Sequence, residues 1–227
     1  MSEFDKLSFE YENTLNRDIS WSGENAEYFA DYKAKCVKEH LGNDFKGSIL
    51  DYGCGIGLVT KYLNKYFDRG RTTITGYDVS KESVKKAGEE LKDINFVSDL
   101  EKIRQGSFDV VIMANVMHHV RPEERHDFLK NISAILKKNG HILIFEHNPY
   151  NPMTRAVVKK TIIDKDAVLM TLKEMNRILN DAEIIIFKKR YIVFFPRSLK
   201  ALRFLEPFLG MIPIGAQYLC VAKHAGT

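Results

Sequence analysis

The sequence predicts an α/β domain in which a mostly parallel, doubly wound sheet carries helices on both faces. Short runs rich in β-branched residues alternate with stretches that have apolar residues at helical spacing, a pattern typical of strand–helix–strand units. One run, Phe108–Ala114, is almost continuously apolar, as expected of a strand buried on both sides near the sheet centre. Another, Ser48–Tyr52, breaks into a turn with glycines at positions 53, 55 and 57, which indicates a ligand-binding loop.

The strands and helices can be placed in order along the chain. A helix is expected over Ser22–Leu41, with Ser22 or Asn25 as its cap. A second helix should begin at Pro122, because proline favours the first helical position, and should be closed by Lys137, Lys138 and Gly140. The expected strands are 48–52, 72–77, 94–98, 108–114, 141–146, 183–194 and 217–223, and the remaining helices are 58–67, 81–91 and 168–179.

Two segments interrupt this alternation, and both follow strands whose ends would face a ligand crevice. The segment 147–166 contains two prolines and a short helix with Arg155, and the segment 197–215 has leucines at helical spacing. The leucine pattern is as typical of a plain packing helix as of a substrate or partner surface. We expect a single domain over 1–227, with an N-terminal helical cap over 1–47 and lids at 147–166 and 197–215.

Composition and charge exclude several classes of protein. The net charge is +4, but the cations are spread along the chain without a dense basic stripe, so no nucleic-acid partner is expected. No apolar run approaches the ~20 residues that a membrane span needs, and the acidic, aromatic N-terminus does not resemble a secretion signal. The three cysteines lack metal-ligand spacing. We therefore expect a cytoplasmic protein without structural zinc or stable membrane insertion.

The glycine loop does not fit a dinucleotide-binding fingerprint. That fingerprint is glycine-x-glycine-x-x-glycine, and counting from Gly53 and Gly55 its last position falls on Leu58, with Gly57 one place early. The spacing weakens a nicotinamide-dependent oxidoreductase hypothesis.

Four landmarks in order make the sequence resemble class I S-adenosylmethionine-dependent methyltransferases. They are the loop Asp51-x-Gly53-x-Gly55-x-Gly57, Asp78 after the second strand, Ser98-Asp99-Leu100 after the third, and the fourth strand leading into Asn115-Val116-Met117-His118-His119. The resemblance covers roughly residues 45 to 147. It implies a Rossmann-like sheet of seven strands with an antiparallel last strand, S-adenosylmethionine as cofactor and S-adenosylhomocysteine as product.

The resemblance also implies roles for the residues that match it. Asp51 would attract the ammonium of the methionine moiety, near the backbone of Gly53, Cys54, Gly55 and Gly57. Asp78, with Val79 beside it, would accept the ribose hydroxyls, although Asp78 could instead cap the following helix. Asp99 would address the adenine amino group between Ser98 and Leu100, or be only a polar turn residue. Asn115 and Val116 would line the wall where sulfonium and acceptor meet.

The histidines and aromatic residues supply candidates for the acceptor side. His119 or His147 could take a proton from an acceptor hydroxyl, because imidazole titrates near neutral pH, or could merely be packed or hydrogen-bonded. No metal is expected, since adjacent side chains in an extended segment point apart and no suitable carboxylate set accompanies His118 and His119. The expected acceptor pocket is lined by Trp21, Tyr28, Tyr32, Tyr150 and Arg155.

Three functions are compatible with these observations. Methyl transfer to a small-molecule acceptor is favoured, because the slot after the fourth strand resembles that of small-molecule methyltransferases. Asn148-Pro149-Tyr150 resembles a signature of base and amide methyltransferases, but it follows the fifth strand instead of the fourth. The alternatives are a nicotinamide-dependent oxidoreductase with an atypical loop, and a non-catalytic protein that keeps the cofactor pocket and docks a partner. No pattern in the sequence predicts an oligomeric state.

Overall fold

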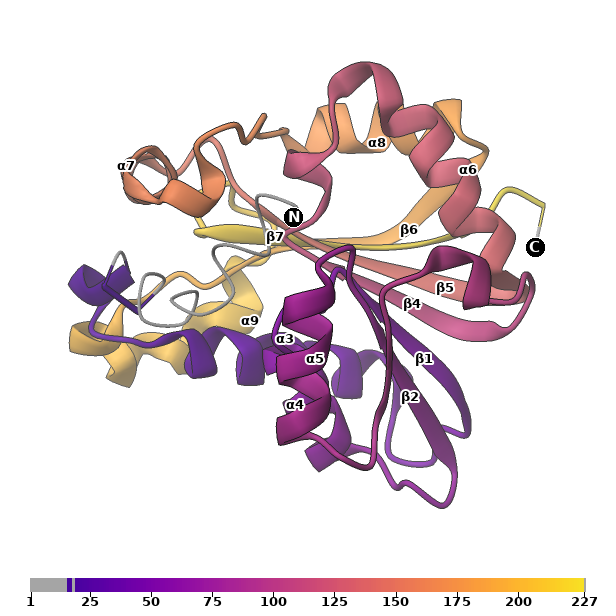
Figure 1. Cartoon of the computed structure of the whole chain (residues 1–227). Helices are drawn as coiled ribbons and strands as arrows, with labels where there is room; N and C mark the ends of the chain where they lie inside the picture. Colours follow the sequence, from indigo (N-terminus) through magenta and orange to yellow (C-terminus); the bar gives the residue numbers. More distant parts are fainter. Residues whose placement is uncertain (1–15, 18, 227) are drawn as a thin grey trace.

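The computed structural model describes residues 16–17 and 19–226 and contains a seven-stranded sheet (Figure 1). The strands lie in the order β3-β2-β1-β4-β5-β7-β6. Strands β1 to β5 are parallel, and β7 is antiparallel to both β5 and β6. The expected mostly parallel sheet with an antiparallel last strand is confirmed. The strands are β1 (Gly47–Tyr52), β2 (Thr72–Tyr77), β3 (Asn95–Val97), β4 (Phe108–Ala114), β5 (Leu136–His147), β6 (Ile184–Ile192) and β7 (Gln217–His224).

Helices connect the strands and cover the sheet. The described α-helices are α3 (Ala26–Leu41), α4 (Leu58–Tyr66), α5 (Lys81–Glu90), α6 (Arg125–Ile135), α7 (Pro152–Lys160), α8 (Leu172–Asp181) and α9 (Glu206–Leu209). The short 3-10 helices are η1 (Ser20–Ser22), η2 (Leu100–Lys102), η3 (Met117–His119), η4 (Pro122–Glu124), η5 (Ile162–Asp164) and η6 (Arg197–Leu205). No helix in the described ranges is both long and apolar enough to cross a bilayer.

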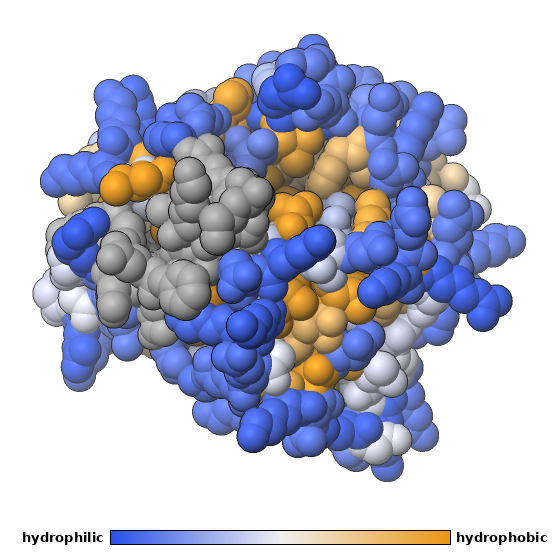
Figure 2. Space-filling model, in the orientation of Figure 1, coloured by the Kyte–Doolittle hydropathy of each residue, from blue (hydrophilic) through white to orange (hydrophobic). Residues whose placement is uncertain are grey.

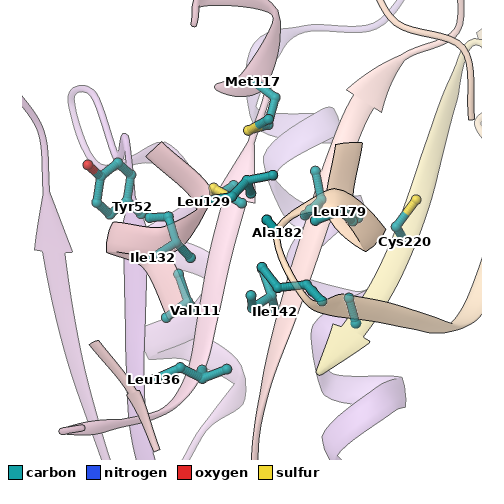
Figure 3. Packing of buried hydrophobic residues seen from close by; sticks show 14 of the residues in the cluster. Tyr52, Val111, Met117, Leu129, Ile132, Leu136, Ile142, Leu179, Ala182 and Cys220 are labelled. Carbon is teal, nitrogen blue, oxygen red and sulfur yellow. The ribbon is translucent and has the colours of Figure 1, made fainter. Parts of the chain in front are cut away.

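Alternating strand residues build a separate core on each face of the sheet. On one face, Ile49 and Ile112 pack with residues of α3 and α4, such as Val37 and Leu63. On the other face, residues of β4 and β5 pack with α6 and α8, as Figure 3 shows for Val111, Ile142, Leu129, Ile132 and Leu179. Because side chains of a strand alternate between faces, the continuous apolar run of β4 supplies both cores, as its sequence predicted.

The helix expected from Pro122 to Gly140 ends earlier than predicted. Pro122 begins η4, α6 ends at Ile135, and β5 already begins at Leu136. Leu136 pairs with Phe108 of β4 and is buried in the core. The lysines and glycine that resemble a helix end lie on the strand extension instead, where Lys137 Nζ contacts Asp109 Oδ2 at 2.7 Å. Pairing with β4 and burial of Leu136 therefore outweigh the local helix-end signal.

The helix expected over 168–179 is displaced toward the C-terminus. Thr171 caps α8, and Thr171 and Glu174 form a reciprocal capping box. The residues before the cap are extended, and the Val168 amide donates to the carbonyl of His118 (2.8 Å). The apolar residues that resemble a helix start therefore lie in the connection before α8, which is hydrogen-bonded to the chain after β4.

The predicted lid segments both contain short helices. The segment 147–166 holds α7 and η5, and Asn151 caps α7 by accepting the amides of Met153 and Thr154. The segment 197–215 holds η6 and α9, whose Glu206 is buried and accepts the hydroxyl hydrogen bond of Tyr32 (2.8 Å). This bond joins the second segment to α3, next to which α9 lies in Figure 1. Leu199 and Leu202 remain exposed, so the leucine spacing does not mark a buried helix face.

Candidate active site

The glycine loop leaves β1 through a turn that only small residues can follow. Gly53 has φ of 77°, in the left-handed region that side chains disfavour. A Cβ atom added there would lie 2.5 Å from Cγ2 of Val116, the residue after Asn115 at the end of β4. The loop and the chain after β4 are thus in direct contact. Gly53 is required both for the turn and for this close approach.

The loop amides are bonded to the end of the neighbouring strand. The amides of Gly53 and Cys54 both donate to the carbonyl of Tyr77, at 2.7 and 2.9 Å. The amide of Gly55 donates to Asp78 Oδ2 (2.8 Å), and the amide of Ser80 donates to Asp78 Oδ1 (2.9 Å). Asp78 therefore fixes the loop to the start of α5.

A pocket opens beside this loop and is lined by α3, α7, η5 and the ends of β1, β4, β5 and β7. Three of its lining residues carry buried oxygen atoms without a hydrogen-bond partner among the described residues: Asp51 Oδ1, Asn115 Oδ1 and Gln217 Oε1. Buried polar atoms are normally satisfied, so unpartnered oxygens around one pocket indicate a ligand with donor groups. Asn115 also has φ of 62°, an uncommon backbone conformation of the kind that clusters at functional sites.

Asp51 and Lys33 place opposite charges in the wall of this pocket. Burial raises the pKa of Asp51 to about 6, although Thr60 donates a hydrogen bond of 2.6 Å to Asp51 Oδ2. Burial lowers the pKa of Lys33, on α3, to about 8. A carboxylate and an ammonium group that are both desolvated can bind a zwitterionic amino-acid group, because each gains a partner that water no longer provides.

A compact group of histidines and carboxylates forms another part of the site, in which His119, His147 and Asp164 line the pocket. His118 and His119 lie on η3, with their Nε2 atoms 3.0 Å apart. Asp164, at the end of η5, places Oδ1 at 3.3 Å from His118 Nε2 and 3.5 Å from His119 Nε2, and its Oδ2 is 3.8 Å from His147 Nε2. Glu146 Oε2 is 2.6 Å from His118 Nδ1. We call these five residues the histidine corner.

The assumption that His118 and His119 point apart is wrong. It treated the segment after β4 as extended, whereas these residues form a 3-10 helix, and their rings lie 4.2 Å apart between centroids. The backbone turn brings both rings to the same side, toward β5 and η5. The carboxylates that were not recognised in the sequence, Glu146 and Asp164, come from those two elements.

Burial and neighbouring charges give these histidines different proton affinities. Burial of the His118 ring opposes its charging, but the carboxylates of Glu146 and Asp164 outweigh burial and raise its pKa to about 10. Burial, followed by the nearby charge of His118, lowers the pKa values of His119 and His147 to about 4. At neutral pH His119 and His147 are therefore neutral imidazoles whose nitrogen lone pairs can accept a proton or a cation.

Comparison with known proteins identifies the family. A family profile described as a methyltransferase domain matches residues 50–144, the part that holds the glycine loop and β4. The chain is 29% identical over 203 residues to the carboxy-S-adenosyl-L-methionine synthase of Helicobacter pylori strain HPAG1, covering 86% of this chain and 80% of that protein. The chain belongs to the class I S-adenosylmethionine-dependent methyltransferases. Its cofactor is S-adenosylmethionine and its product S-adenosylhomocysteine.

Two further similarities agree with this family. An uncharacterised methyltransferase of Staphylococcus carnosus strain TM300 is 29% identical over 151 residues, which are 64% of this chain and 67% of that protein. In fold, a TehB-like methyltransferase from Corynebacterium glutamicum superposes with a TM-score of 0.64 at 17% identity, covering 96% of this chain and 98% of that one. The protein is thus a methyltransferase, and the nicotinamide and non-catalytic alternatives are set aside.

The residues predicted to bind the cofactor in this methyltransferase fall into two groups. Asp51, Gly53, Cys54, Gly55 and Asn115 line the pocket. A second group lies outside the lining: Asp78, Val79, Ser98, Asp99, Leu100, Val116 and Gly57. Most of them stand at or after the ends of β2 and β3, where the parallel strands bring their carboxyl ends to one edge. Their nucleoside-binding roles stay predictions; Asp99 also caps η2 by accepting the amide of Glu101.

The residues predicted to bind the acceptor are dispersed. Tyr28, Tyr32, Tyr150 and Arg155 are not among the described residues that line the pocket, and the side chain of Trp21 lies outside the described part. Tyr150 is 60% exposed, and the hydroxyl of Tyr32 is bonded to Glu206. The helical cap and α7 do contribute pocket residues, but these are on other faces of the two helices: Ala26, Phe29, Ala30, Lys33, Thr154 and Val157.

Sequence reasoning missed four polar residues of this site: Lys33, Glu146, Asp164 and Gln217. A lysine among apolar residues of the first helix, or a glutamate ending an apolar strand, is a weak signal that could have marked Lys33 and Glu146. Asp164 stands in a connection with several acidic and basic residues, and only the fold singles it out. Gln217 lies opposite His147 in the β5–β7 ladder, a pairing that the sequence does not specify.

Proposed function

We propose that this enzyme transfers the methyl group of S-adenosylmethionine to a small organic acceptor bound in the pocket. The observation that carries the proposal is the continuity of that pocket, which reaches from the glycine loop and Asp51 to His119 and His147. A single cavity that joins cofactor residues to neutral imidazoles lets the sulfonium and an acceptor hydroxyl approach each other.

The cofactor is proposed to span the loop, with its two ends in different environments. The ammonium of the methionine moiety would pair with the unpartnered Asp51 Oδ1, and the carboxylate would face Lys33. The nucleoside would extend over the loop toward Asp78 and Asp99 at the ends of β2 and β3. Asn115 would then face the sulfonium, since it lines the pocket at the end of β4 and its buried Oδ1 has no hydrogen-bond partner among the described residues.

Catalysis at this site is proposed to depend mainly on alignment and exclusion of water. The acceptor oxygen attacks the methyl carbon opposite to sulfur, the carbon–sulfur bond breaks, and its electron pair remains on sulfur as the neutral thioether. The hydroxyl proton passes to an imidazole, for which His119 and His147 are the candidates in the pocket wall. Both rings are neutral at pH 7, so each has a lone pair for the proton, but a pKa near 4 makes each a weak base and leaves alignment as the larger contribution.

An acceptor with an apolar body and one polar reacting group suits the rest of the wall. Apolar groups from α3, α7 and η5, including Phe29, Val157 and Ile163, also line the pocket. Asn148 does not provide a base-recognition group, because its Nδ2 donates to the carbonyls of Pro213 and Gly215 at 3.1 and 2.8 Å. Its role in holding the segment before β7 supports a small-molecule acceptor over a nucleic-acid base.

The surface supports a protein that acts away from nucleic acids and membranes. Hydrophilic side chains cover much of the face shown in Figure 2, and cations such as Arg190 and Lys61 are paired with Glu39 and Glu27. We propose a cytoplasmic location, which agrees with three cysteines that are all buried and unpaired. Fractionation with and without a secretion reporter tests this location.

Ligand binding followed by turnover tests the proposed function. S-adenosylmethionine and S-adenosylhomocysteine should each raise the melting temperature, whereas NAD should not. Radiolabelled methyl transfer to a library of hydroxylated aromatic and aliphatic compounds should then identify an acceptor. Methylation of RNA or protein alone, with no turnover on any small molecule, would contradict the proposed acceptor class but not the enzyme class.

A second candidate is formation of a carboxylated cofactor, the product named for the Helicobacter pylori relative. The observation that favours it is Lys33, a buried cation in the pocket wall that could pair with an additional carboxylate. Mass spectrometry of the nucleoside that co-purifies with the protein distinguishes the two. Recovery of a carboxylated S-adenosylmethionine would favour this candidate, and recovery of S-adenosylhomocysteine would favour methyl transfer.

A further inference from the structure

The histidine corner has the donor arrangement of a metal site. His118, His147 and Asp164 each offer one ligand atom, and these atoms all lie within 4.8 Å of one another. His119 lies beside this group, with its Nε2 at 3.0 Å from His118 Nε2 and 3.5 Å from Asp164 Oδ1. Two imidazoles and one carboxylate are a donor set suited to zinc and other first-row transition ions, and unlike the all-oxygen sets of magnesium or calcium.

One donor separation in the corner is close to that of a metal-centred tetrahedron. Metal–nitrogen and metal–oxygen bonds of zinc are about 2.0–2.1 Å, which places neighbouring donors of a tetrahedron about 3.3 Å apart. His118 Nε2 lies 3.3 Å from Asp164 Oδ1, and His147 Nε2 lies 3.8 Å from the other oxygen, Oδ2. Since the three ligand atoms all lie within 4.8 Å of one another, the side chains would close around the ion when it binds.

A carboxylate behind the ligands provides an independent observation. Histidines that bind metals usually donate their second ring N–H to a carboxylate or carbonyl, which fixes the ring and its tautomer. Glu146, which is 1% exposed, holds His118 in this way through Nδ1 at 2.6 Å, and its other oxygen accepts the amide of Met117 (2.8 Å). The ring is therefore oriented with Nε2 toward Asp164 and the pocket.

Charge balance agrees with a cation in the corner. Glu146 is fully buried and Asp164 is only about 10% exposed, and two desolvated carboxylates this close together require positive charge beside them. That charge is either a proton shared within the histidines or a divalent ion. These two possibilities differ in one measurable respect, which is the metal content of the purified protein.

We propose that the enzyme binds one divalent transition-metal ion, of the zinc class, through His118, His147 and Asp164, with the fourth tetrahedral position open to the pocket. Because His119, His147 and Asp164 also line the pocket, the ion would stand in the wall that the acceptor contacts. Metal binding is independent of the proposed methyl acceptor. Its part in the reaction rests on the proposed function.

The ion would change how the acceptor is activated. A hydroxyl bound to a divalent transition metal loses its proton near neutral pH, so the proton can pass to solvent instead of to an imidazole. The ion would thus supply a more nucleophilic acceptor oxygen for the displacement, in which the carbon–sulfur bond would break with its electron pair left on sulfur. His147 would then be a ligand, in place of the proton acceptor that the sequence suggested, and His119 would stand beside the ion.

Titration of the purified full-length chain with metal ions tests the site. After removal of metals by a chelator, calorimetry should show about one equivalent of Zn²⁺ bound, and Mg²⁺ at the same concentration should give no such binding. Co²⁺ should bind in place of Zn²⁺ and give the intense visible absorption of a tetrahedral complex. Wild-type protein that binds neither Zn²⁺ nor Co²⁺ near one equivalent would overturn the proposal, leaving the proton-sharing alternative.

Single substitutions make the test specific to the corner. Asp164→Asn and His147→Gln should each weaken Zn²⁺ binding about tenfold or more, while His141→Gln should leave it unchanged. His141 is a suitable control because it also lies 3.1 Å from another histidine, His40, but forms no ion pair with a carboxylate among the described residues. Equal Zn²⁺ affinity in wild type and Asp164→Asn would contradict the site.

Cofactor binding keeps this proposal separate from the proposed function. The Asp164→Asn variant should bind S-adenosylmethionine as wild type does, since the ion pairs of Asp164 are with the histidines and not with residues of the glycine loop. Loss of Zn²⁺ binding with retained cofactor binding would support the metal site. If wild type binds Zn²⁺ but transfers no methyl group to any small acceptor, the metal site stands and the proposed acceptor class fails.

Discussion

The two walls of the pocket are built on different principles. The loop wall comes from one continuous stretch, β1 followed by the glycines, and its contacts are mostly with the adjacent strand β2. The histidine corner is assembled from η3, the end of β5 and η5, so its central contact, His118 with Glu146, joins residues 28 positions apart. The loop wall can be recognised in the sequence as a motif. The residues of the histidine corner come together only in the folded chain.

The difference also concerns what holds each wall in shape. Backbone amides of the loop are bonded to Tyr77 and Asp78, so its geometry depends on main-chain bonds and on glycine. In the corner, side chains hold one another through charge in a desolvated environment. Substitutions should therefore alter the loop wall through steric fit and the corner through charge.

The largest effect is expected for Asp78→Ala. The variant removes the proposed charge-assisted bonds to the ribose and the bond to the Gly55 amide, each of which contributes about 1.5–3 kcal/mol. Affinity for S-adenosylmethionine measured by calorimetry should fall by about two orders of magnitude, while the far-UV circular dichroism spectrum is retained. Asp93→Ala, which removes an exposed partner of Arg69, is the matched control. Unchanged cofactor affinity in Asp78→Ala would contradict the ribose assignment.

Glu146→Gln should alter the corner without touching the loop wall. The amide preserves the shape of the side chain but removes the charge beside His118. Loss of such a carboxylate behind a metal ligand typically weakens metal affinity by 10–100-fold, so a Zn²⁺ titration should show a decrease in this range. Cofactor affinity should stay near the wild-type value. Loss of both Zn²⁺ affinity and cofactor affinity would show that the two walls are coupled. It would contradict the view that the loop wall and the corner are held in shape independently.

Gly53→Ala tests whether close contact with Val116 requires a glycine at this position of the loop. The new Cβ would lie 2.5 Å from Val116 Cγ2, whereas a Cβ at Gly55, which also has positive φ, would meet no atom within 4 Å. Since overpacking costs about 1–3 kcal/mol, Gly53→Ala should lower the free energy of unfolding by about 2 kcal/mol more than Gly55→Ala. Urea denaturation measures the difference.

A second substitution checks that this cost is steric. Adding Val116→Ala removes the Cγ2 atom that the new methyl group would contact. The double variant Gly53→Ala/Val116→Ala should therefore be less destabilised than the sum of the two single variants predicts. Strict additivity would show that the backbone angle alone accounts for the effect.

The smallest effect is expected at His40 and His141, a histidine pair outside the corner. Burial, followed by the neighbouring His141, lowers the pKa of His40 to about 4, below the value near 6.5 of an unfolded chain. Above pH 6.5 His40 is neutral in both states. As the pH falls from 6.5 to 4, only the unfolded state gains the proton, so stability is lost.

The His40→Gln variant measures this contribution. Urea midpoints should fall between pH 7 and pH 5 in both proteins, because other groups also titrate, but the decrease should be smaller in His40→Gln than in wild type. Equal slopes would show that His40 is protonated as readily in the folded protein as in the unfolded chain. The pair thus shows how two adjacent histidines behave without the carboxylates of the corner.

Most strands and the cofactor loop were predictable because their signals are local. The β4 run was predicted with its observed bounds, since a strand buried on both faces must be apolar at every position. The wrong predictions lie where contacts between residues far apart in the sequence determine the secondary structure or the direction of a side chain. Leu136–Gly140 reads as a helix end, yet pairing of Leu136 with Phe108 makes it strand. Likewise, the aromatic residues of α3 were sensible acceptor candidates, but the helix turns Phe29 and Lys33 toward the pocket instead.

The amino-acid sequence by itself determined the order of strands and helices and the glycine turn after β1, because each depends on neighbours a few residues apart. It also indicated the cofactor, because four short motifs follow one another in the order typical of the family. Tertiary structure alone decided which side chains share the pocket with that cofactor. Asp164, Glu146 and the two histidines of η3 are ordinary polar residues in the sequence. Their chemistry arises from burial beside one another, and burial is a property of the folded chain.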